Sequence, residues 1–141
     1  VTSIPAVLAI GDATEIHLDG RAVPRGEHWE AARFDGERAA ATILGASPPP
    51  PTAPWFWTDR HGVHVEIVGS MARAARIVVR GEVGSVPFAA FGVRDGRVVG
   101  AVAVDEPKAV RAARRMIDRG IAVDPDALAD PATDLRRLLR A

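Results

Sequence analysis

Four consecutive prolines at positions 48–51 constrain the fold of this chain more than any other feature. Proline has a fixed φ angle and no amide hydrogen, so the run can continue neither a helix nor the interior of a sheet. The surrounding segment 46–54 contains five prolines in all, which predicts a stiff, extended linker. The sequence therefore indicates two separately packed parts, residues 1–45 and residues 55–141.

A continuous apolar run over residues 4–10 opens the first part and stops at Gly11 and Asp12. Such a run is typical of a strand buried on both faces of a parallel sheet. Ligands of open α/β sheets bind just beyond the carboxyl ends of these strands, although an ordinary glycine–aspartate turn is the alternative. The sequence offers no parallel neighbour and no G-x-G-x-x-G loop, so we expect residues 1–45 to belong to an incomplete α/β domain. Alone, the run should be disordered, repacked or paired with another chain.

A helix is predicted over residues 26–44, after a polar connection over residues 13–25. It should end at Gly45, which suits a left-handed cap. Apolar and small residues recur at three- and four-residue steps and form one face that includes Trp29. If the helix start lies beside Asp12, its exposed amide groups would favour an anion or an electron-rich ring there. A packed surface helix with Trp29 as a core anchor is the alternative.

Residues 55–141 have the pattern of an α+β domain. Apolar and polar residues alternate over residues 61–104, which predicts about four strands in a meander, and Asp95-Gly96 predicts a hairpin turn. The whole domain should be an antiparallel β-sheet of about four to five strands covered by helices. The aromatic residues 55–57 must be buried, and one of them can line a ligand site at a domain interface.

A helix should begin near Pro107 and end at Gly120, followed by a turn to Leu128 and a last helix from Asp130-Pro131. The first of these helices carries a dense group of basic residues. They form either a solvated face or a docking patch for an acidic partner. These residues are Arg111, Arg114, Arg115 and Arg119.

Composition excludes several function classes. The 18 basic and 18 acidic residues cancel, so no global field favours nucleic acid or an anionic membrane. Cysteine is absent, which excludes disulfides, thiolate metal sites and thiol catalysis and fits a reducing, cytoplasmic location. No apolar stretch is long enough to span a membrane. The four histidines lack a metal-ligand spacing, and no catalytic residue can be identified.

Four stretches together resemble one family. Residues 9–12 (AIGD), 27–32 (EHWEAA), 54–59 (PWFWTD) and 128–135 (LADPATDL) are similar to the C-terminal third of the FAD-dependent, NAD(P)H-oxidising ferredoxin and rubredoxin reductases. This family includes putidaredoxin reductase and the ferredoxin reductases of Rieske dioxygenases. The resemblance implies that residues 1–45 are the end of an FAD-binding domain and that the last domain docks a ferredoxin.

The resemblance also implies site residues. Asp12 would hydrogen-bond the ribityl chain of FAD, the start of the following helix would lie against the flavin, and Trp57 would approach the flavin and the nicotinamide site. The expected FAD contacts are Gly11, Asp12, Glu27, His28, Trp29 and Trp57. Ala31 and Arg60 stand where the family commonly has asparagine and glutamine, so the details of flavin contact and docking are open at these positions.

The expected activity is electron transfer from NAD(P)H through FAD to an iron–sulfur ferredoxin. This chain alone should be inactive and should not bind FAD, because the nucleotide-binding glycine loops lie outside it. The alternative is a stand-alone, non-catalytic interface or dimerisation module related to these reductases. The choice of NADH or NADPH, the particular ferredoxin and the formation of a homodimer are open.

Overall fold

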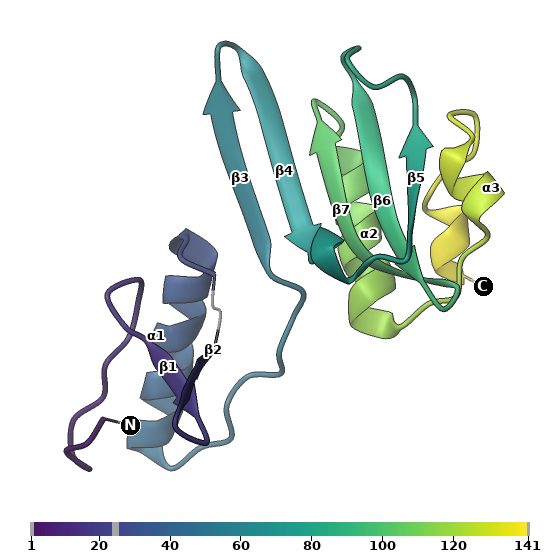
Figure 1. Cartoon of the computed structure of the whole chain (residues 1–141). Helices are drawn as coiled ribbons and strands as arrows, with labels where there is room; N and C mark the ends of the chain where they lie inside the picture. Colours follow the sequence, from purple (N-terminus) through teal and green to yellow (C-terminus); the bar gives the residue numbers. More distant parts are fainter. Residues whose placement is uncertain (1, 24–25, 141) are drawn as a thin grey trace. The chain divides into compact units, whose positions relative to one another are not determined.

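The computed structural model describes residues 2–23 and 26–140 and divides into two compact units (Figure 1). Unit 1 comprises Val1–Pro54 and unit 2 comprises Trp55–Ala141. The boundary falls at the end of the proline-rich segment. Within the described residues, no helix is long and apolar enough to cross a lipid bilayer.

Unit 1 contains a small hairpin and one long helix. Strands β1 (Ile16–Leu18) and β2 (Arg21–Val23) pair antiparallel. Both residues of the turn between them, Asp19 and Gly20, have positive φ angles (51° and 74°), which suits a tight hairpin. The predicted polar connection over residues 13–25 therefore contains a turn at Asp19-Gly20, as its turn signal indicated, and two short strands that were not predicted.

The apolar run over residues 4–10 is not a strand. It makes turns instead, and the amide of Val7 donates to the carbonyl of Ile4 at 2.9 Å. Ile4, Val7 and Ile10 are 60%, 45% and 48% exposed. A strand buried on both faces requires neighbouring strands, and none of the described strands pairs with this run. The prediction of a strand was therefore wrong for this chain, and most of the run is exposed.

Helix α1 (Trp29–Leu44) begins later than predicted because His28 caps it. His28 has extended backbone, and its ring Nδ1 accepts a hydrogen bond from the amide of Ala31 at 3.3 Å. The expected left-handed cap at Gly45 is confirmed, with φ at 63°. The predicted packed face is not buried, since Trp29 is 62% exposed and Leu44 is 79% exposed.

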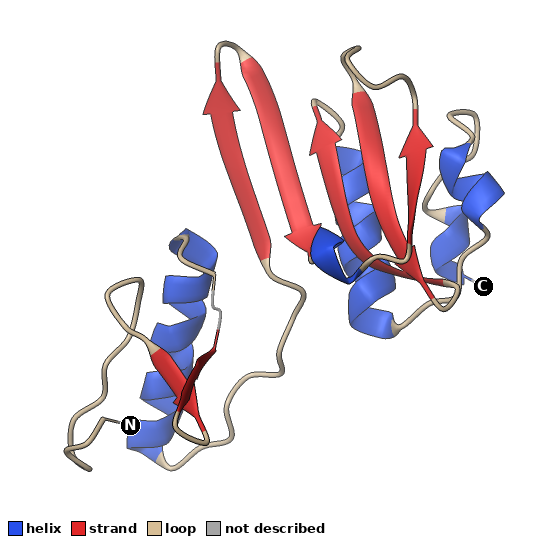
Figure 2. Cartoon of the chain, in the orientation of Figure 1, coloured by secondary structure: helices blue, strands red, loops and turns tan. Residues whose placement is uncertain are grey.

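Unit 2 is built on one antiparallel sheet of five strands (Figure 2). The order across the sheet is β3-β4-β7-β6-β5, so the antiparallel sheet is confirmed but the meander was wrong. The Asp95-Gly96 hairpin is confirmed, with φ angles of 50° and 70°. The strands are β3 (Trp55–Arg60), β4 (Val63–Gly69), β5 (Arg76–Arg80), β6 (Phe88–Arg94) and β7 (Arg97–Val104).

Glycines explain how the chain leaves β4 for the far edge of the sheet. After Gly69, which has a φ of 67°, the 3-10 helix η1 (Met71–Arg73) packs closely on the neighbouring strands. A Cβ atom on Gly100 would lie 2.7 Å from the Met71 amide nitrogen, and one on Gly92 would lie 2.9 Å from the Ala74 Cβ. These two positions must therefore lack side chains for η1 to cross here.

Helix α2 (Pro107–Arg119) covers one face of the sheet, and its predicted start and end are confirmed. Its buried residues meet side chains of the sheet to form the core of unit 2. Helix α3 (Pro125–Ala129) follows and buries Leu128. The largest fully buried side chains of the described residues are Phe91, Met116, Leu128, Val68 and Val110.

The predicted last helix from Asp130-Pro131 was wrong. The Asp130 carboxylate instead accepts hydrogen bonds from the Ala132 amide (2.9 Å) and the Thr133 hydroxyl (2.8 Å) and forms a tight turn. A short 3-10 helix, η2 (Arg137–Arg140), follows. The guanidinium of Arg80 on β5 holds this tail by donating to four backbone carbonyls, those of Leu128, Asp130, Pro131 and Thr133.

Candidate functional site

A cavity of about 520 Å³ lies in unit 2 between the β3–β4 hairpin and α2. The pairing register accounts for the side chains that face it. Trp57 lies opposite Glu66, and Asp59 lies opposite His64, so all four project from the same face of the sheet. The residues lining the cavity are Trp55, Trp57, His64, Glu66, Pro107, Val110, Arg111 and Arg114.

Two stacked tryptophans form the aromatic wall. Trp55 and Trp57 are two residues apart in β3, their ring centroids are 4.8 Å apart, and their planes are inclined by 23°. The indole Nε1–H of Trp55 donates to Glu66 Oε2 at 2.7 Å, which fixes the first ring. Phe56 lies between them in sequence, projects to the opposite face and is 40% exposed. The expectation that all three aromatics are buried was therefore wrong: Phe56 is exposed, and Trp55 and Trp57 are only partly buried.

His64 lies between two carboxylates. Its Nδ1 is 2.6 Å from Asp59 Oδ1, and its Nε2 is 3.4 Å from Glu66 Oε1. The hydrogen bond to Asp59 raises the pKa of His64 above its ordinary value, and the charge of Glu66 adds to this effect. Glu66 is buried, with 6% of its surface exposed. The site therefore combines aromatic rings with charges of both signs.

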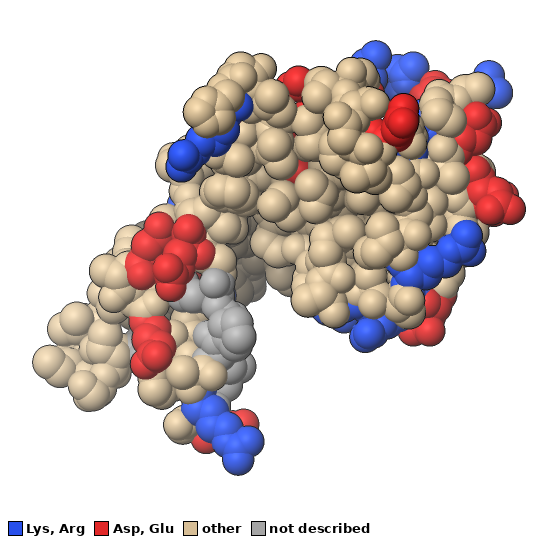
Figure 3. Space-filling view, turned by 45° about the horizontal axis from the view of Figure 1, so that its top comes forward, with Lys and Arg blue, Asp and Glu red and all other residues tan. Residues whose placement is uncertain are grey.

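The four arginines that were predicted to form one basic patch lie in two different places on α2. Arg111 and Arg114 line the cavity beside Trp57, whereas Arg115 and Arg119 are exposed elsewhere on α2. Arg111 is held by a hydrogen bond from its Nε to the Pro107 carbonyl at 3.2 Å. On the face shown in Figure 3, basic and acidic side chains are scattered over a largely uncharged surface.

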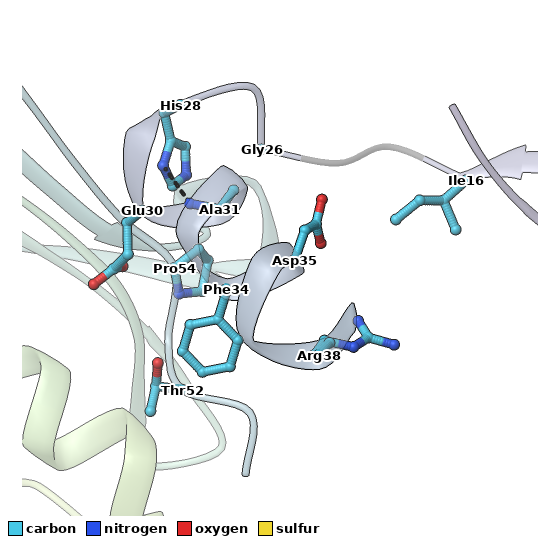
Figure 4. Close-up of a pocket in the computed structure, with 10 residues that line it drawn as sticks. All are labelled: Ile16, Gly26, His28, Glu30, Ala31, Phe34, Asp35, Arg38, Thr52 and Pro54. Carbon is cyan, nitrogen blue, oxygen red and sulfur yellow. Dashed lines mark hydrogen bonds between the residues drawn. The ribbon is translucent and has the colours of Figure 1, made fainter. Parts of the chain in front are cut away.

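Unit 1 has a smaller cavity, of about 170 Å³, at the start of α1. Figure 4 shows the His28 ring turned toward the Ala31 amide at this point. Of the expected flavin residues in unit 1, only His28 lines this cavity. Its other lining residues are Ile16, Gly26, Glu30, Ala31, Phe34, Asp35, Arg38, Thr52 and Pro54.

The other expected flavin residues of unit 1 lie outside that cavity. The amide of Gly11 donates to Asp35 Oδ2 at 3.2 Å, so the glycine lies against α1 beyond its first turn. Asp12 and Glu27 are exposed. Trp29 presents its ring to solvent, with the Arg33 guanidinium 5.9 Å from the ring centroid. The structure thus places Asp12 near the first half of α1 and leaves its carboxylate accessible.

Sequence reasoning did not identify His64 and Glu66 as site residues. The available signal was the alternation His64-x-Glu66 opposite Trp57-x-Asp59, across a two-residue turn at His61-Gly62. That signal becomes visible only once residues 55–60 are recognised as a strand. No group of metal-binding side chains is found in the part of the chain that the structure describes.

Comparisons with known proteins agree on one family. Residues 55–139 match the family model described as "Reductase C-terminal". A ferredoxin–NAD(+) reductase component of the anthranilate 1,2-dioxygenase system of Burkholderia cepacia is 37% identical over 98% of this chain and 34% of its own length. A probable ferredoxin reductase of Castellaniella defragrans is 33% identical over 97% of this chain and 34% of its own length.

Solved structures give the same picture. The chain in a covalent putidaredoxin reductase–putidaredoxin complex matches with a TM-score of 0.85 and 28% identity, covering 98% of this chain and 33% of that chain. A ferredoxin reductase for the CYP199A2 system of Rhodopseudomonas palustris matches with a TM-score of 0.77 and 28% identity, covering 91% and 32%. This chain spans about a third of the length of the relatives that it matches.

Proposed function

This chain belongs to the reductase C-terminal family, and from that premise we propose that it is the C-terminal part of an FAD-dependent reductase that passes electrons from NAD(P)H to a ferredoxin. One observation carries the proposal. Relatives named as ferredoxin reductases match almost the whole chain, including unit 1, which lies outside the family model. Residues 1–45 would then be the end of an FAD-binding domain, residues 46–54 the linker and residues 55–141 the docking domain.

The residues assigned to FAD in unit 1 are chemically suited to it. The exposed Asp12 carboxylate can accept hydrogen bonds from ribityl hydroxyls, and Gly11, with a φ of 80°, leaves room for close approach. The exposed indole of Trp29 offers an apolar surface to a ring. When bound, FAD would supply the hydride and electron chemistry. Gly11, Asp12, Glu27, His28 and Trp29 would help to hold it, and Trp57 would contribute from unit 2.

The proposed partner is a small iron–sulfur ferredoxin with an acidic surface. Opposite charges speed the encounter of two proteins and contribute less to the lifetime of the complex, which suits electron transfer. The arginines of α2 would supply the positive charge. Arg111 and Arg114 line the same cavity as Trp57, which supports a docking region close to that aromatic residue.

Expression of the gene with its upstream codons tests the proposal. The longer protein should bind about one FAD per chain and reduce ferredoxin with NADH or NADPH, whereas this chain should remain colourless after gel filtration with FAD. The adenine and pyrophosphate part of FAD requires a glycine-rich loop that these residues lack. A native product that begins near Val1 would instead support a non-catalytic interface module. Retention of FAD by this chain at equal molar ratio would contradict the assignment.

Charge reversal on α2 tests the docking region separately. In the longer protein, the double variant Arg114→Glu and Arg115→Glu should slow ferredoxin reduction about tenfold or more at low salt. Reduction of a small artificial acceptor should be unchanged. Reversal of two exposed arginines of unit 2 that lie outside α2, Arg73 and Arg94, is the matched control. Equal ferredoxin rates for wild type and the α2 variant would mean that this helix is only a solvated face.

A further inference from the structure

We propose that Glu66 and His64 are positioning residues for the stacked Trp55–Trp57 pair, and that protonation of His64 determines how firmly the pair is held. The role proposed for His64 and Glu66 depends only on contacts within unit 2. Its importance for electron transfer, through Trp57, rests on the proposed function. The experiment below tests the contacts alone and does not depend on the proposed function.

A continuous series of contacts links the histidine to the tryptophans. One oxygen of Glu66, Oε2, accepts the Trp55 indole hydrogen at 2.7 Å, and the other, Oε1, faces His64 Nε2 at 3.4 Å. The second nitrogen of His64 is bonded to Asp59 Oδ1 at 2.6 Å. Trp55 in turn stacks on Trp57. Movement of the Glu66 carboxylate would therefore be transmitted to the tryptophan pair.

The donor capacity of imidazole explains why protonation matters. A protonated histidine donates from both ring nitrogens and can satisfy Asp59 and Glu66 together. A neutral histidine has one N–H, so it can donate to only one of the two carboxylates. The shorter contact is with Asp59, and Glu66 would be the carboxylate that loses its donor. Glu66 is 6% exposed, and a buried carboxylate that loses a charged partner is destabilised.

The other charged groups around His64 come from β3, β4, α2 and the connection between β7 and α2. Asp59 lies on β3 and Glu66 on β4, and Arg111 and Arg114 of α2 line the same cavity. Asp105 also accepts a hydrogen bond from the His64 backbone amide at 2.9 Å. Histidine is the side chain whose ordinary pKa lies within the physiological range. The pKa of His64 is raised, chiefly by the hydrogen bond to Asp59. The protonated histidine, which donates to both Asp59 and Glu66, should therefore persist above about pH 6.5.

The test uses this chain with Trp29 replaced by phenylalanine, so that only the stacked pair reports. Exciton-coupled circular dichroism of the two indoles should weaken as pH rises through the His64 pKa, which NMR measures in the same sample. His64→Gln should abolish this pH dependence. Asp59→Asn should move its midpoint down by about one pH unit, because the neighbouring charge is lost. The matched control is His61→Asn at the adjacent hairpin turn, which should leave the profile unchanged.

Glu66→Gln separates the charge of the carboxylate from its hydrogen bond. The amide oxygen can still accept from Trp55, so the stack should form, but its signal should no longer change with pH. Persistence of the pH dependence in His64→Gln, or an unmoved midpoint in Asp59→Asn, would overturn the proposal. Asp59 and His64 are exposed enough for these two variants to fold, and they decide the outcome even if Glu66→Gln does not fold.

Discussion

Unit 2 fully buries several large apolar side chains, although it exposes Phe56, Ile77, Val79, Val83 and Val86, whereas the described part of unit 1 fully buries none. Phe91, Met116 and Leu128 of unit 2 are completely enclosed. Among the described residues of unit 1, Ala53 is the single buried hydrophobic residue. The exposed large hydrophobic residues of unit 1 are Ile4, Val7, Ile10, Trp29, Ile43 and Leu44.

The difference in burial shows that the apolar face of the helix in unit 2 has a sheet to pack against, whereas the described apolar segments of unit 1 have no such cover. In unit 2 an amphipathic helix meets the face of a sheet from the same chain, so its apolar residues pack together. In unit 1 the run over residues 4–10 and the apolar side of α1 lack such a cover among the described residues. Exposed apolar surface of this kind marks an interaction site. This supports the proposal that unit 1 completes a larger domain.

The largest expected effect is that unit 1 unfolds when it is produced without unit 2. Residues 55–141 alone should unfold cooperatively in denaturant, because their core lies within the unit. Residues 1–54 alone should show no cooperative transition. Amide exchange across residues 7–10 should be fast in the whole chain. Slow exchange there in a dilute monomer would show that unit 1 forms its own core and would remove the contrast.

Truncation of one leucine in each unit gives a smaller, quantitative comparison. Leu128→Ala should lower the free energy of unfolding by about 2–5 kcal/mol, because the side chain is fully buried and leaves a cavity. Leu44→Ala, at a residue 79% exposed, should change it by less than about 0.5 kcal/mol. Urea unfolding followed by circular dichroism measures both. Similar losses for the two variants would contradict the difference in burial.

The tail of unit 2 should depend on Arg80. Arg80→Ala removes the donor to four backbone carbonyls and should cost about 2 kcal/mol in unfolding free energy, discounted for partial exposure. Arg80→Lys should recover only part of this loss. An ammonium group still donates hydrogen bonds, but it lacks the planar fork of the guanidinium. The control is Arg94→Ala, an exposed arginine on the next strand. If Arg80→Ala lowered the free energy of unfolding no more than Arg94→Ala does, the hydrogen bonds from Arg80 to the tail would not stabilise unit 2.

The smallest expected effect is on acid stability. The Ala132 amide and the Thr133 hydroxyl bond the Asp130 carboxylate and hold its pKa below the ordinary value. Its stabilising contribution is therefore present above about pH 4 and is lost as pH falls through the lowered pKa. Asp130→Asn should reduce this part of the acid sensitivity of unit 2, measured as unfolding midpoints from neutral to acidic pH. An unchanged acid profile would show that the turn does not depend on the charge.

Local patterns predicted much of unit 2. Proline at the first turn and a left-handed glycine at the end located α2, and the aspartate–glycine pair located the β6–β7 turn. The pairing of β4 with β7 could not be predicted in this way. It depends on η1 crossing over Gly92 and Gly100, and close approach of two segments leaves no periodic signal in the sequence.

The wrong prediction of a last helix and the omission of Glu66 also arose from contacts between segments that are distant in the sequence. Asp130-Pro131 has the residues of a helix start, yet the Asp130 side chain closes a turn on Ala132 and Thr133 while Arg80 binds the carbonyls. At the site, sequence reasoning named Trp57, Arg111 and Arg114, and the structure brings these three to one cavity. Glu66 was missed because its importance depends on the register of a strand that had not been predicted. Its contact with the tryptophans is a property of pairing.

The strand order also affects how unit 2 folds during synthesis. The β3–β4 hairpin leaves the ribosome before β7, the strand that β4 must join, and residues 70–104 separate the end of β4 from the end of β7. At roughly 5–20 residues per second, translation of these 35 residues takes about 2–7 seconds. During that interval the hairpin residues Phe56 and Ile67 have no completed sheet around them, so we expect the emerging hairpin to expose apolar surface and to be open to proteolysis. Ribosome-bound chains in which β4 but not β7 has left the exit tunnel should accordingly be cleaved by protease, whereas chains extended until α2 has emerged should resist it.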